Sequence, residues 1–140
     1  MICALFGNRD CPYLKEEALE CLICNLIQKQ GVTCFYVGNH GAFDRKAALV
    51  LKKVSKQFDW VRYYVVLAYY PTDSHLAKDH PTILADGVET VLPKFRIIYR
   101  NKWMIRQAQV VACYLHDITG NTRNLAEYAQ RKGKDIIVIN

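Results

Sequence analysis

The chain has 140 residues, of which 51% are hydrophobic and 23% are charged, and its formal net charge is +6. This length suits one domain, 1–140, with its own hydrophobic core, and the composition excludes a disordered or fibrous protein. The first ten residues, MICALFGNRD, are too short a hydrophobic run for a membrane span and lack the basic start of a signal peptide. We therefore expect a cytoplasmic protein with no membrane partner.

The sequence alternates between segments with strand and helix patterns. Runs of hydrophobic, aromatic and β-branched residues predict five strands, at 2–6, 33–38, 62–70, 109–115 and 135–139. Hydrophobic residues at helical spacing, together with helix start and stop signals, predict helices at 13–30, 43–58, 100–108 and 121–133. The segment 72–93 has no clear period and is expected to be an irregular excursion, a kind of long loop that is often functional.

This alternation predicts the fold class. Strands that are joined by helices of this length form right-handed crossovers, and these build a mainly parallel sheet with helices on both faces. We therefore expect a Rossmann-like three-layer α/β domain with a five-stranded sheet.

Six cysteines lie within hydrophobic, periodic segments rather than in loops. Cys21 and Cys24 form a C-x-x-C, but they fall in the middle of a predicted helix and have no second pair at zinc-site spacing. Packing explains them better than metal binding or redox chemistry, because free cysteine behaves as a small hydrophobic residue. We expect all six thiols to be reduced and no metal site.

Three turns that follow predicted strands share glycine, asparagine and polar residues. They are GNRD (7–10), GNHGAFD (38–44) and HDITGNT (116–122). Ligands of open α/β sheets bind beyond the carboxyl ends of the strands, and exposed amides at a following helix start suit phosphate or ribose. The alternative is that these residues only make tight turns. None of the turns is a G-x-G-x-x-G or Walker A sequence, so an ordinary dinucleotide site and an ATPase loop are unsupported.

Four segments together resemble a known family. LFGNRDCP, FYVGNHGAFDRKAA, RNKWMI and TGNTRNLAEYAQRKGK follow in order the pattern of the SLOG superfamily, a Rossmann-like group that includes LOG proteins and DprA. The chain is most similar to the small stand-alone YpsA-like members. The resemblance covers nearly the whole chain and implies that the turns bind a nucleotide or a nucleotide derivative, with no resident cofactor.

The resemblance also implies site residues. Gly7 and Arg9 match a G-x-R after the first strand, and the 38–44 turn matches a glycine-rich turn with an aspartate at the helix start. Asn121 replaces a glycine of the phosphate-binding turn. The complete candidate ligand-binding set is Gly7, Asn8, Arg9, Gly38, Asn39, His40, Gly41, Asp44, Arg100, Asn101, Gly120, Asn121 and Thr122.

Several candidates also have a structural explanation. Arg9 can bind phosphate with two parallel hydrogen bonds or can pair with Asp10. Asp44 can accept a ribose hydroxyl or can stabilise the helix dipole. Asn101 can reach the ligand or can cap a helix. Cys11 stands beside the start of the first helix, where a thiol pKa can be lowered.

We favour a non-enzymatic binding domain for a nucleotide or an ADP-ribose-like molecule. The alternative is a small hydrolase or transferase that acts on N-glycosidic bonds, with Asp44 or Glu127 as the acid and His40 or His116 assisting. LOG enzymes resemble P-G-G-x-G-T-x-x-E, and here no glutamate follows Thr122 before Glu127, so catalytic residues stay unassigned. A third hypothesis, which follows from the basic charge, is nucleic-acid binding. We also expect a homodimer.

Overall fold

The computed structural model describes residues 1–8, 10–70, 78–114 and 121–139. Within them, six strands form one sheet in the order β4-β3-β2-β1-β5-β6, and every neighbouring pair is parallel. The strands are β1 (Ile2–Gly7), β2 (Cys34–Val37), β3 (Arg62–Leu67), β4 (Thr82–Leu84), β5 (Val110–Tyr114) and β6 (Asp135–Ile139).

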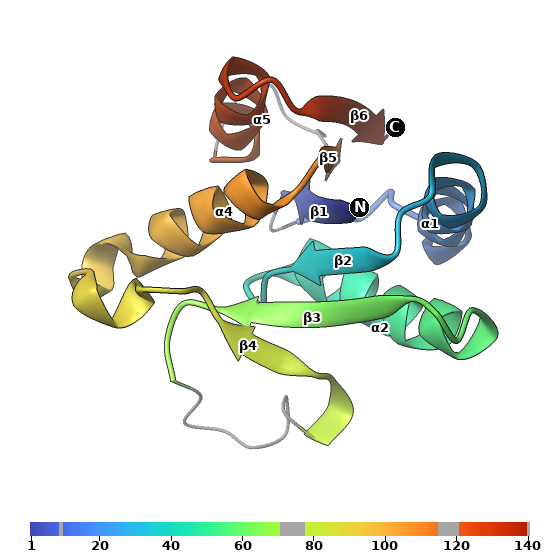
Figure 1. The fold of residues 1–140 in the computed structure, drawn as a ribbon, viewed down its shortest axis with the longest axis horizontal. Helices are drawn as coiled ribbons and strands as arrows, with labels where there is room; N and C mark the ends of the chain where they lie inside the picture. Colours follow the sequence, from blue (N-terminus) through green and yellow to red (C-terminus); the bar gives the residue numbers. More distant parts are fainter. Residues whose placement is uncertain (9, 71–77, 115–120, 140) are drawn as a thin grey trace.

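Helices cover both faces of the sheet, so the molecule has three layers (Figure 1). Helices α1 (Glu16–Gln30) and α2 (Ala42–Gln57) pack on one face, and α4 (Arg96–Gln107) and α5 (Asn121–Arg131) pack on the other. The strand order reverses at β1, which has β2 on one side and β5 on the other. Such a reversal opens a crevice at the carboxyl ends of the strands.

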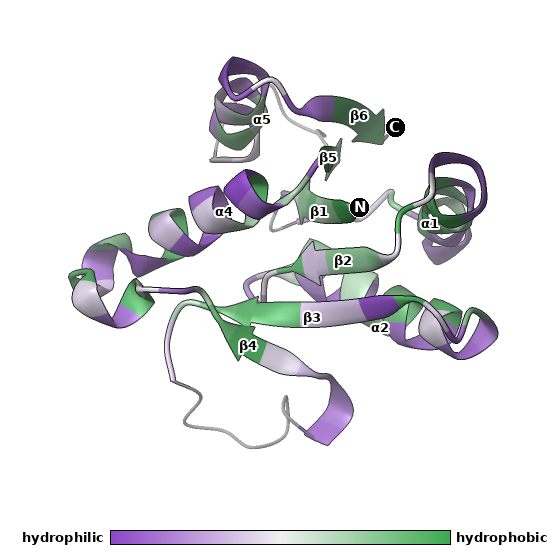
Figure 2. Cartoon of the chain, in the orientation of Figure 1, coloured by the Kyte–Doolittle hydropathy of each residue, from purple (hydrophilic) through white to green (hydrophobic). Residues whose placement is uncertain are grey.

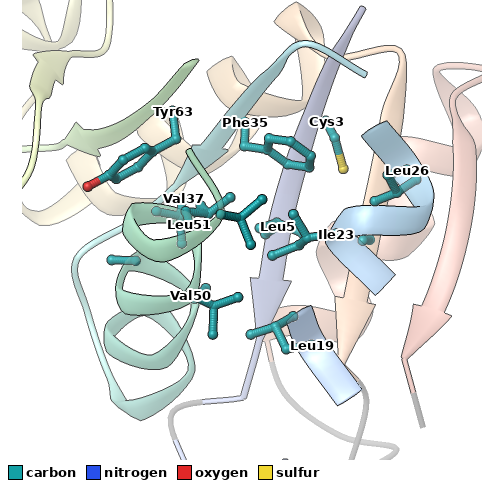
Figure 3. Packing of buried hydrophobic residues seen from close by; sticks show 14 of the residues in the cluster. Cys3, Leu5, Leu19, Ile23, Leu26, Phe35, Val37, Val50, Leu51 and Tyr63 are labelled. Atoms are coloured by element: carbon teal, nitrogen blue, oxygen red, sulfur yellow. The ribbon is translucent and has the colours of Figure 1, made fainter. Parts of the chain in front are cut away.

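The sheet separates two hydrophobic cores because successive strand residues point to opposite faces. Cys3 and Leu5 of β1 pack towards α1 and α2, whereas Ala4 and Phe6 pack towards α4 and α5. Figure 3 shows side chains of the first core, where Leu5 and Phe35 from the sheet meet helix residues. In Figure 2 the central strands are mostly green, the colour of hydrophobic residues, because helices cover both faces of these strands.

The expected fold class is confirmed, with a correction to the strand count. The sheet has six strands rather than five within the described residues, because Thr82–Leu84 adds to the free edge of β3. The segment 72–93 is therefore not wholly irregular: it contains β4 and a short 3-10 helix, Val88–Thr90. Three half-buried residues at a sheet edge are too few to produce a visible period in the sequence.

Helix α4 differs most from its predicted extent. It begins at Arg96 rather than at residue 100, and the 3-10 turn Pro93–Phe95 leads directly into it. Helix α1 begins at Glu16, three residues later than predicted. Strand β3 ends at Leu67, earlier than the predicted 70.

All six cysteines are free thiols, as predicted. Cys3, Cys11 and Cys113 are buried, whereas Cys21 is exposed and Cys24 is half-buried on α1. Burial raises the pKa of the Cys113 thiol to about 12, which keeps it protonated at neutral pH. Among the described helices, none is both long and hydrophobic enough to cross a bilayer.

Candidate functional site

A cavity of about 280 Å³ opens where β1 and β2 end. Its walls come from the turns after these strands, from the first half of α4 and from the first half of α5. The lining residues are Phe6, Gly7, Asn8, Gly38, His40, Asp44, Ile97, Arg100, Asn101, Thr122 and Leu125. Eight of these eleven residues belong to the set that the sequence predicts; Phe6, Ile97 and Leu125 do not.

The turn after β2 is organised around Asp44, in the first turn of α2. The backbone N–H of His40 donates to Asp44 Oδ2 at 2.9 Å. Gly41 precedes the helix with φ 106°, a conformation that other residues rarely adopt. Asp44 therefore holds the turn in place and also stands at the favourable end of the helix dipole.

Arg100 of α4 is buried inside this site and is only 2% exposed. Its Nε donates to Asn101 Oδ1 at 2.7 Å. Its Nη1 donates to Asn39 Oδ1 at 3.0 Å and to the carbonyl of Val66 at 2.9 Å. Its Nη2 lies 3.3 Å from His40 Nδ1. A guanidinium only donates hydrogen bonds, so His40 Nδ1 is the acceptor in this contact.

One N–H group of Arg100 takes no part in these four hydrogen bonds. A guanidinium has five N–H groups, and four of them have partners in the described part of the chain. The remaining N–H belongs to Nη2, and Arg100 lines the cavity. A buried charged donor normally has a partner, because leaving it without one costs free energy. The site is therefore suited to an acceptor that enters the cavity.

Gly38 lets Asp44 and Arg100 approach the end of β2 from two sides. A Cβ at this position would lie 2.9 Å from Asp44 Oδ2 and 3.0 Å from Arg100 Nη2. Both distances are shorter than ordinary contacts. This glycine is thus required for close packing around the two charged groups.

The two charges compensate each other only in part. Burial raises the pKa of Asp44 to about 6, although the His40 N–H and the charges of Arg100 and Arg45 act in the opposite direction. Burial also lowers the pKa of Arg100, and Asp44 and Tyr69 partly offset this. Arginine nevertheless stays protonated in proteins. Below about pH 6 the pair of side chains is therefore net positive.

The turn after β1 forms the opposite wall. A Cβ on Gly7 would overlap the ring of Phe43, which stacks on Tyr114 with a centroid distance of 6.4 Å. Asn8 also lines the cavity. Arg9 lies outside the described residues, so its predicted role stays a prediction.

The third predicted turn is described only from the start of α5. Thr122 is buried and lines the cavity, and Leu125 one turn later adds a hydrophobic contact. Asn121 is the first residue of α5. Gly120 and His116 lie outside the described residues.

Arg100 and Asn101 line the cavity, although their predicted position at the start of the helix was wrong. They lie in the second turn of α4 rather than at its start, so Asn101 is not a helix cap. Asn101 instead accepts the hydrogen bond from Arg100 Nε. Ile97 lies one turn before Asn101 and faces the same cavity; the helical spacing 97, 100, 101 is the signal that could have found it.

Neither the candidate acid Glu127 nor Cys11, the cysteine beside the start of the first predicted helix, lines the cavity. Glu127 is exposed and pairs with Arg123 at 3.4 Å on the surface of α5. Cys11 is buried, and burial raises rather than lowers its pKa, even though Lys46 is near. Lys46 Nζ donates to the Cys11 carbonyl at 3.1 Å instead. Among the described residues, no three His, Cys, Asp or Glu side chains gather to hold a metal ion.

Comparison with known proteins shows the fold. No protein-family model and no curated protein matches the sequence. The structure of DNA processing protein A (DprA) from Streptococcus pneumoniae matches with a TM-score of 0.70 and 18% identity, over 97% of this chain and 49% of that one.

A DprA structure from Helicobacter pylori, which concerns the single-stranded DNA binding mode of that protein, matches with a TM-score of 0.66 and 18% identity, over 99% of this chain and 64% of that one. The chain thus spans about half to two thirds of these proteins. It has the DprA-like fold that the SLOG resemblance implied.

Proposed function

We propose that the cavity binds one nucleotide and that this nucleotide is a unit of a single-stranded nucleic acid. The observation that carries the proposal is the buried Arg100, with one N–H that has no partner in the described chain and that belongs to a side chain lining the cavity. A phosphate oxygen is an anionic acceptor that matches the geometry of a guanidinium and forms strong, charge-assisted hydrogen bonds with it. The protein acts as a binding domain rather than as an enzyme.

The other walls support a nucleotide rather than a free phosphate. Asp44 and Asn101 offer oxygen acceptors for sugar hydroxyls or base amino groups, while Ile97 and Leu125 offer hydrophobic contacts for a base. A volume of about 280 Å³ lies just below the range that is usual for small-molecule sites, about 300–1,000 Å³. The cavity therefore has room for one unit and not for a dinucleotide.

Two facts favour a polymer as the source of the nucleotide. The net charge of +6 attracts polyanions. The fold is shared with a DprA whose structure concerns single-stranded DNA binding. A likeness in fold is only an analogy for function, so the free nucleotide, such as an ADP-ribose-like molecule, is the second source to test.

The first test compares Arg100→Lys with Arg62→Lys. Lysine keeps the charge but loses the planar fork that reaches several acceptors. Arg62 makes an exposed contact to the Asp59 carbonyl far from the cavity and serves as the matched control. We expect Arg100→Lys to weaken binding of both a labelled dT12 oligonucleotide and dTMP by about tenfold, the equivalent of about 1.4 kcal/mol. The readout is fluorescence anisotropy for the oligonucleotide and calorimetry for dTMP.

Comparison of a single-stranded oligonucleotide with free nucleotides shows whether the bound nucleotide belongs to a nucleic acid or is a free molecule. Loss of both affinities in Arg100→Lys, with the control unchanged and circular dichroism native, supports the nucleotide site. Tight binding of ADP-ribose with no measurable dT12 binding by the parent protein would show that the ligand is free. Equal affinities of parent and Arg100→Lys for every nucleotide tested would refute the site.

A second test uses two glycines with positive φ. Gly41 has φ 106° in the site turn, and Gly31 has φ 75° at the end of α1. Valine strains both positions, but only Gly41→Val also places a branched side chain at the turn that borders the cavity. We expect Gly41→Val to abolish binding and Gly31→Val to keep it, with both variants less stable than the parent.

Arg9→Ala tests the role predicted for the turn after β1. Removal of a charge-assisted contact worth roughly 1.5–3 kcal/mol lowers affinity about tenfold or more. We expect folding to be unchanged. If calorimetry showed Arg9→Ala binding like the parent, phosphate recognition would belong to Arg100 without Arg9.

One observation favours an enzyme as the second candidate function. Asp44 lines the cavity and has a pKa of about 6, which suits a general acid near neutral pH. A hydrolase of N-glycosidic bonds would release free base from a nucleotide panel, and Asp44→Asn would stop the release. We expect no released base, as detected by chromatography after prolonged incubation.

A further inference from the structure

Positive charge is concentrated in one part of the chain. Residues 93–134 contain nine Lys and Arg but only two Asp and Glu, a net charge of +7, which exceeds the +6 of the whole protein. The rest of the chain is therefore close to neutral. Residues 93–134 include both helices of one layer, α4 and α5, which pack against each other (Figure 1).

Three of these cations gather around one aromatic ring. Lys102 Nζ lies 5.2 Å from the centre of the Tyr128 ring, Lys132 Nζ lies 5.6 Å from it, and the Arg131 guanidinium lies 6.0 Å from it. Cation–π attraction is worth only about 0.5–1 kcal/mol at exposed sites, so it orients the three cations without neutralising them. We refer to Lys102, Tyr128, Arg131 and Lys132 as the basic cluster.

No carboxylate neutralises this cluster within the described part of the chain. Its three cations make no ion pair there, and the adjacent Glu127 pairs with Arg123. Like charges held near one ring repel one another, and a polyanion offsets this repulsion when the cations replace the counterions condensed on its phosphates. The cluster is therefore prepared for a ligand that carries several negative charges.

A groove of about 230 Å³ lies beside the candidate site and borders the basic cluster. It runs between α4 and α5 and is lined by Ile97, Ile98, Asn101, Lys102, Asn124 and Leu125. Three of these residues, Ile97, Asn101 and Leu125, also line the nucleotide cavity, and Lys102 belongs to the cluster. The cavity and the groove are thus neighbours that share a wall, and the groove borders the cluster at Lys102.

The groove has the chemistry of a nucleobase site. Ile98 is 50% exposed although it is hydrophobic, and the amides of Asn101 and Asn124 can both donate and accept hydrogen bonds. Single-stranded nucleic acids bind in grooves that combine contacts to base faces with cations along the backbone. The small volume suits one unstacked base rather than a duplex.

We propose that this groove and the basic cluster form a second contact for single-stranded nucleic acid, which continues the strand whose first nucleotide occupies the cavity. This proposal rests on the proposed function. An acidic peptide also carries negative charge, but the neighbouring nucleotide site and the partly hydrophobic groove of the size of a base favour nucleic acid.

The test removes the three cations together in Lys102→Gln/Arg131→Gln/Lys132→Gln. The matched control, Lys29→Gln/Lys52→Gln/Lys56→Gln, removes the same charge from α1 and α2 on the other face of the sheet. Anisotropy titrations of both variants and the parent use labelled dT12 at several salt concentrations. Calorimetry with dTMP and circular dichroism accompany them.

We expect the cluster variant to bind dT12 at least tenfold more weakly than the control. Each phosphate contact to a single strand contributes about −0.7 to the slope of log K against log salt, so three lost contacts flatten the slope by about 2. Affinity for dTMP should stay at the parent value, because a single nucleotide fills only the cavity.

Three results would overturn this proposal. The first is a cluster variant whose dT12 affinity and salt slope equal those of the control. The second is that polyglutamate binds the parent as tightly as dT12 does and that the cluster variant loses this binding. The cluster would then be a site for an acidic peptide. The third is a parent that binds dTMP but not dT12, which refutes the second contact and leaves the nucleotide cavity intact.

Discussion

At the scale of single residues, the site depends on a buried arginine and a half-buried aspartate that both lie close to one glycine. Gly38 leaves room for Asp44 and Arg100 at the end of β2. A Cβ at this position would lie too close to both side chains. The protein keeps a carboxylate where burial disfavours its charge. Ionisable groups with shifted pKa values often lie at functional sites, where a protein is less stable than it could be because the site needs the charged group for its function.

This arrangement predicts the pH dependence of stability. The folded-state pKa of Asp44 is about 6, above the unfolded value of 3.8, so the folded state binds the proton more tightly. The contribution of Asp44 is therefore most favourable below about pH 4, and stability falls as the pH rises from there through about 6. Asp44→Asn should remove this loss and raise the free energy of unfolding at pH 7.5 by on the order of 2 kcal/mol.

Urea unfolding of both proteins at pH 4, 5, 6 and 7.5 measures the effect. The difference between Asp44→Asn and the parent should grow through this range and then level off. Parallel pH profiles of the two proteins would show that Asp44 does not have a raised pKa.

A second residue-scale prediction concerns Gly7. Its α-hydrogen faces the ring of Phe43, which is buried and stacked on Tyr114 and so cannot move aside freely. Gly7→Ala should therefore lower the free energy of unfolding by about 1–3 kcal/mol, the usual cost of overpacking a core. The double variant Gly7→Ala/Phe43→Leu should recover part of the loss. If thermal melts gave Gly7→Ala the parent midpoint, the close packing at the end of β1 would be disproved.

At the scale of elements, helix ends were easier to locate than helix starts. Gly31 ends α1 in the left-handed region with φ 75°, and its N–H bonds to the Leu26 carbonyl. Gly133 adopts φ 72° just beyond α5. Glycine is the ordinary residue for this position, so the sequence located both ends. The start of α4 follows a proline-containing 3-10 turn and has no side-chain cap to mark it.

The end of α1 gives the element-scale prediction. Nothing lies within 4 Å of a Cβ at Gly31, so a substitution there costs only backbone strain. Gly31→Ala should destabilise the protein by about 1 kcal/mol, and Gly31→Asn by less, because asparagine tolerates the left-handed region. Urea midpoints measure this order. Alanine and asparagine variants of equal stability would contradict it.

At the scale of the whole molecule, the two helical layers differ in charge. The layer of α4 and α5 lies within the segment of net charge +7. The other layer exposes Cys21 on α1 beside the half-buried Cys24. The two layers therefore differ both in charge and in the exposure of their cysteines.

A homodimer remains our prediction for the assembly. Its motivation is the position of Cys21 and Cys24, away from the centre of the core, and a symmetric pair is the commonest closed assembly. Light scattering at micromolar concentration should give twice the chain mass of 16.1 kDa. Cys21→Arg should shift the mass towards the monomer. A parent that scatters as a monomer would reject the dimer.

The sequence by itself determined five of the six strands and their alternation with helices along the chain, the two-sided burial of the central strands, and the turns that border the cavity. These features depend on local signals: runs such as ICALF, helical spacing of hydrophobic residues, and glycines after strands. Gly7, Gly38 and Asp44 could be named because each stands directly after a predicted strand or at a helix start.

Tertiary structure alone decided which of these local features meet. Thr82–Leu84 becomes a strand because the edge of β3 supplies its hydrogen bonds, and three residues carry no period of their own. Arg100 contacts Asn39, 61 residues earlier in the chain, because α4 packs over the carboxyl end of the sheet. Its burial, the raised pKa of Asp44 and the groove beside the basic cluster all follow from that packing, which depends on residues distant in sequence and leaves no local pattern.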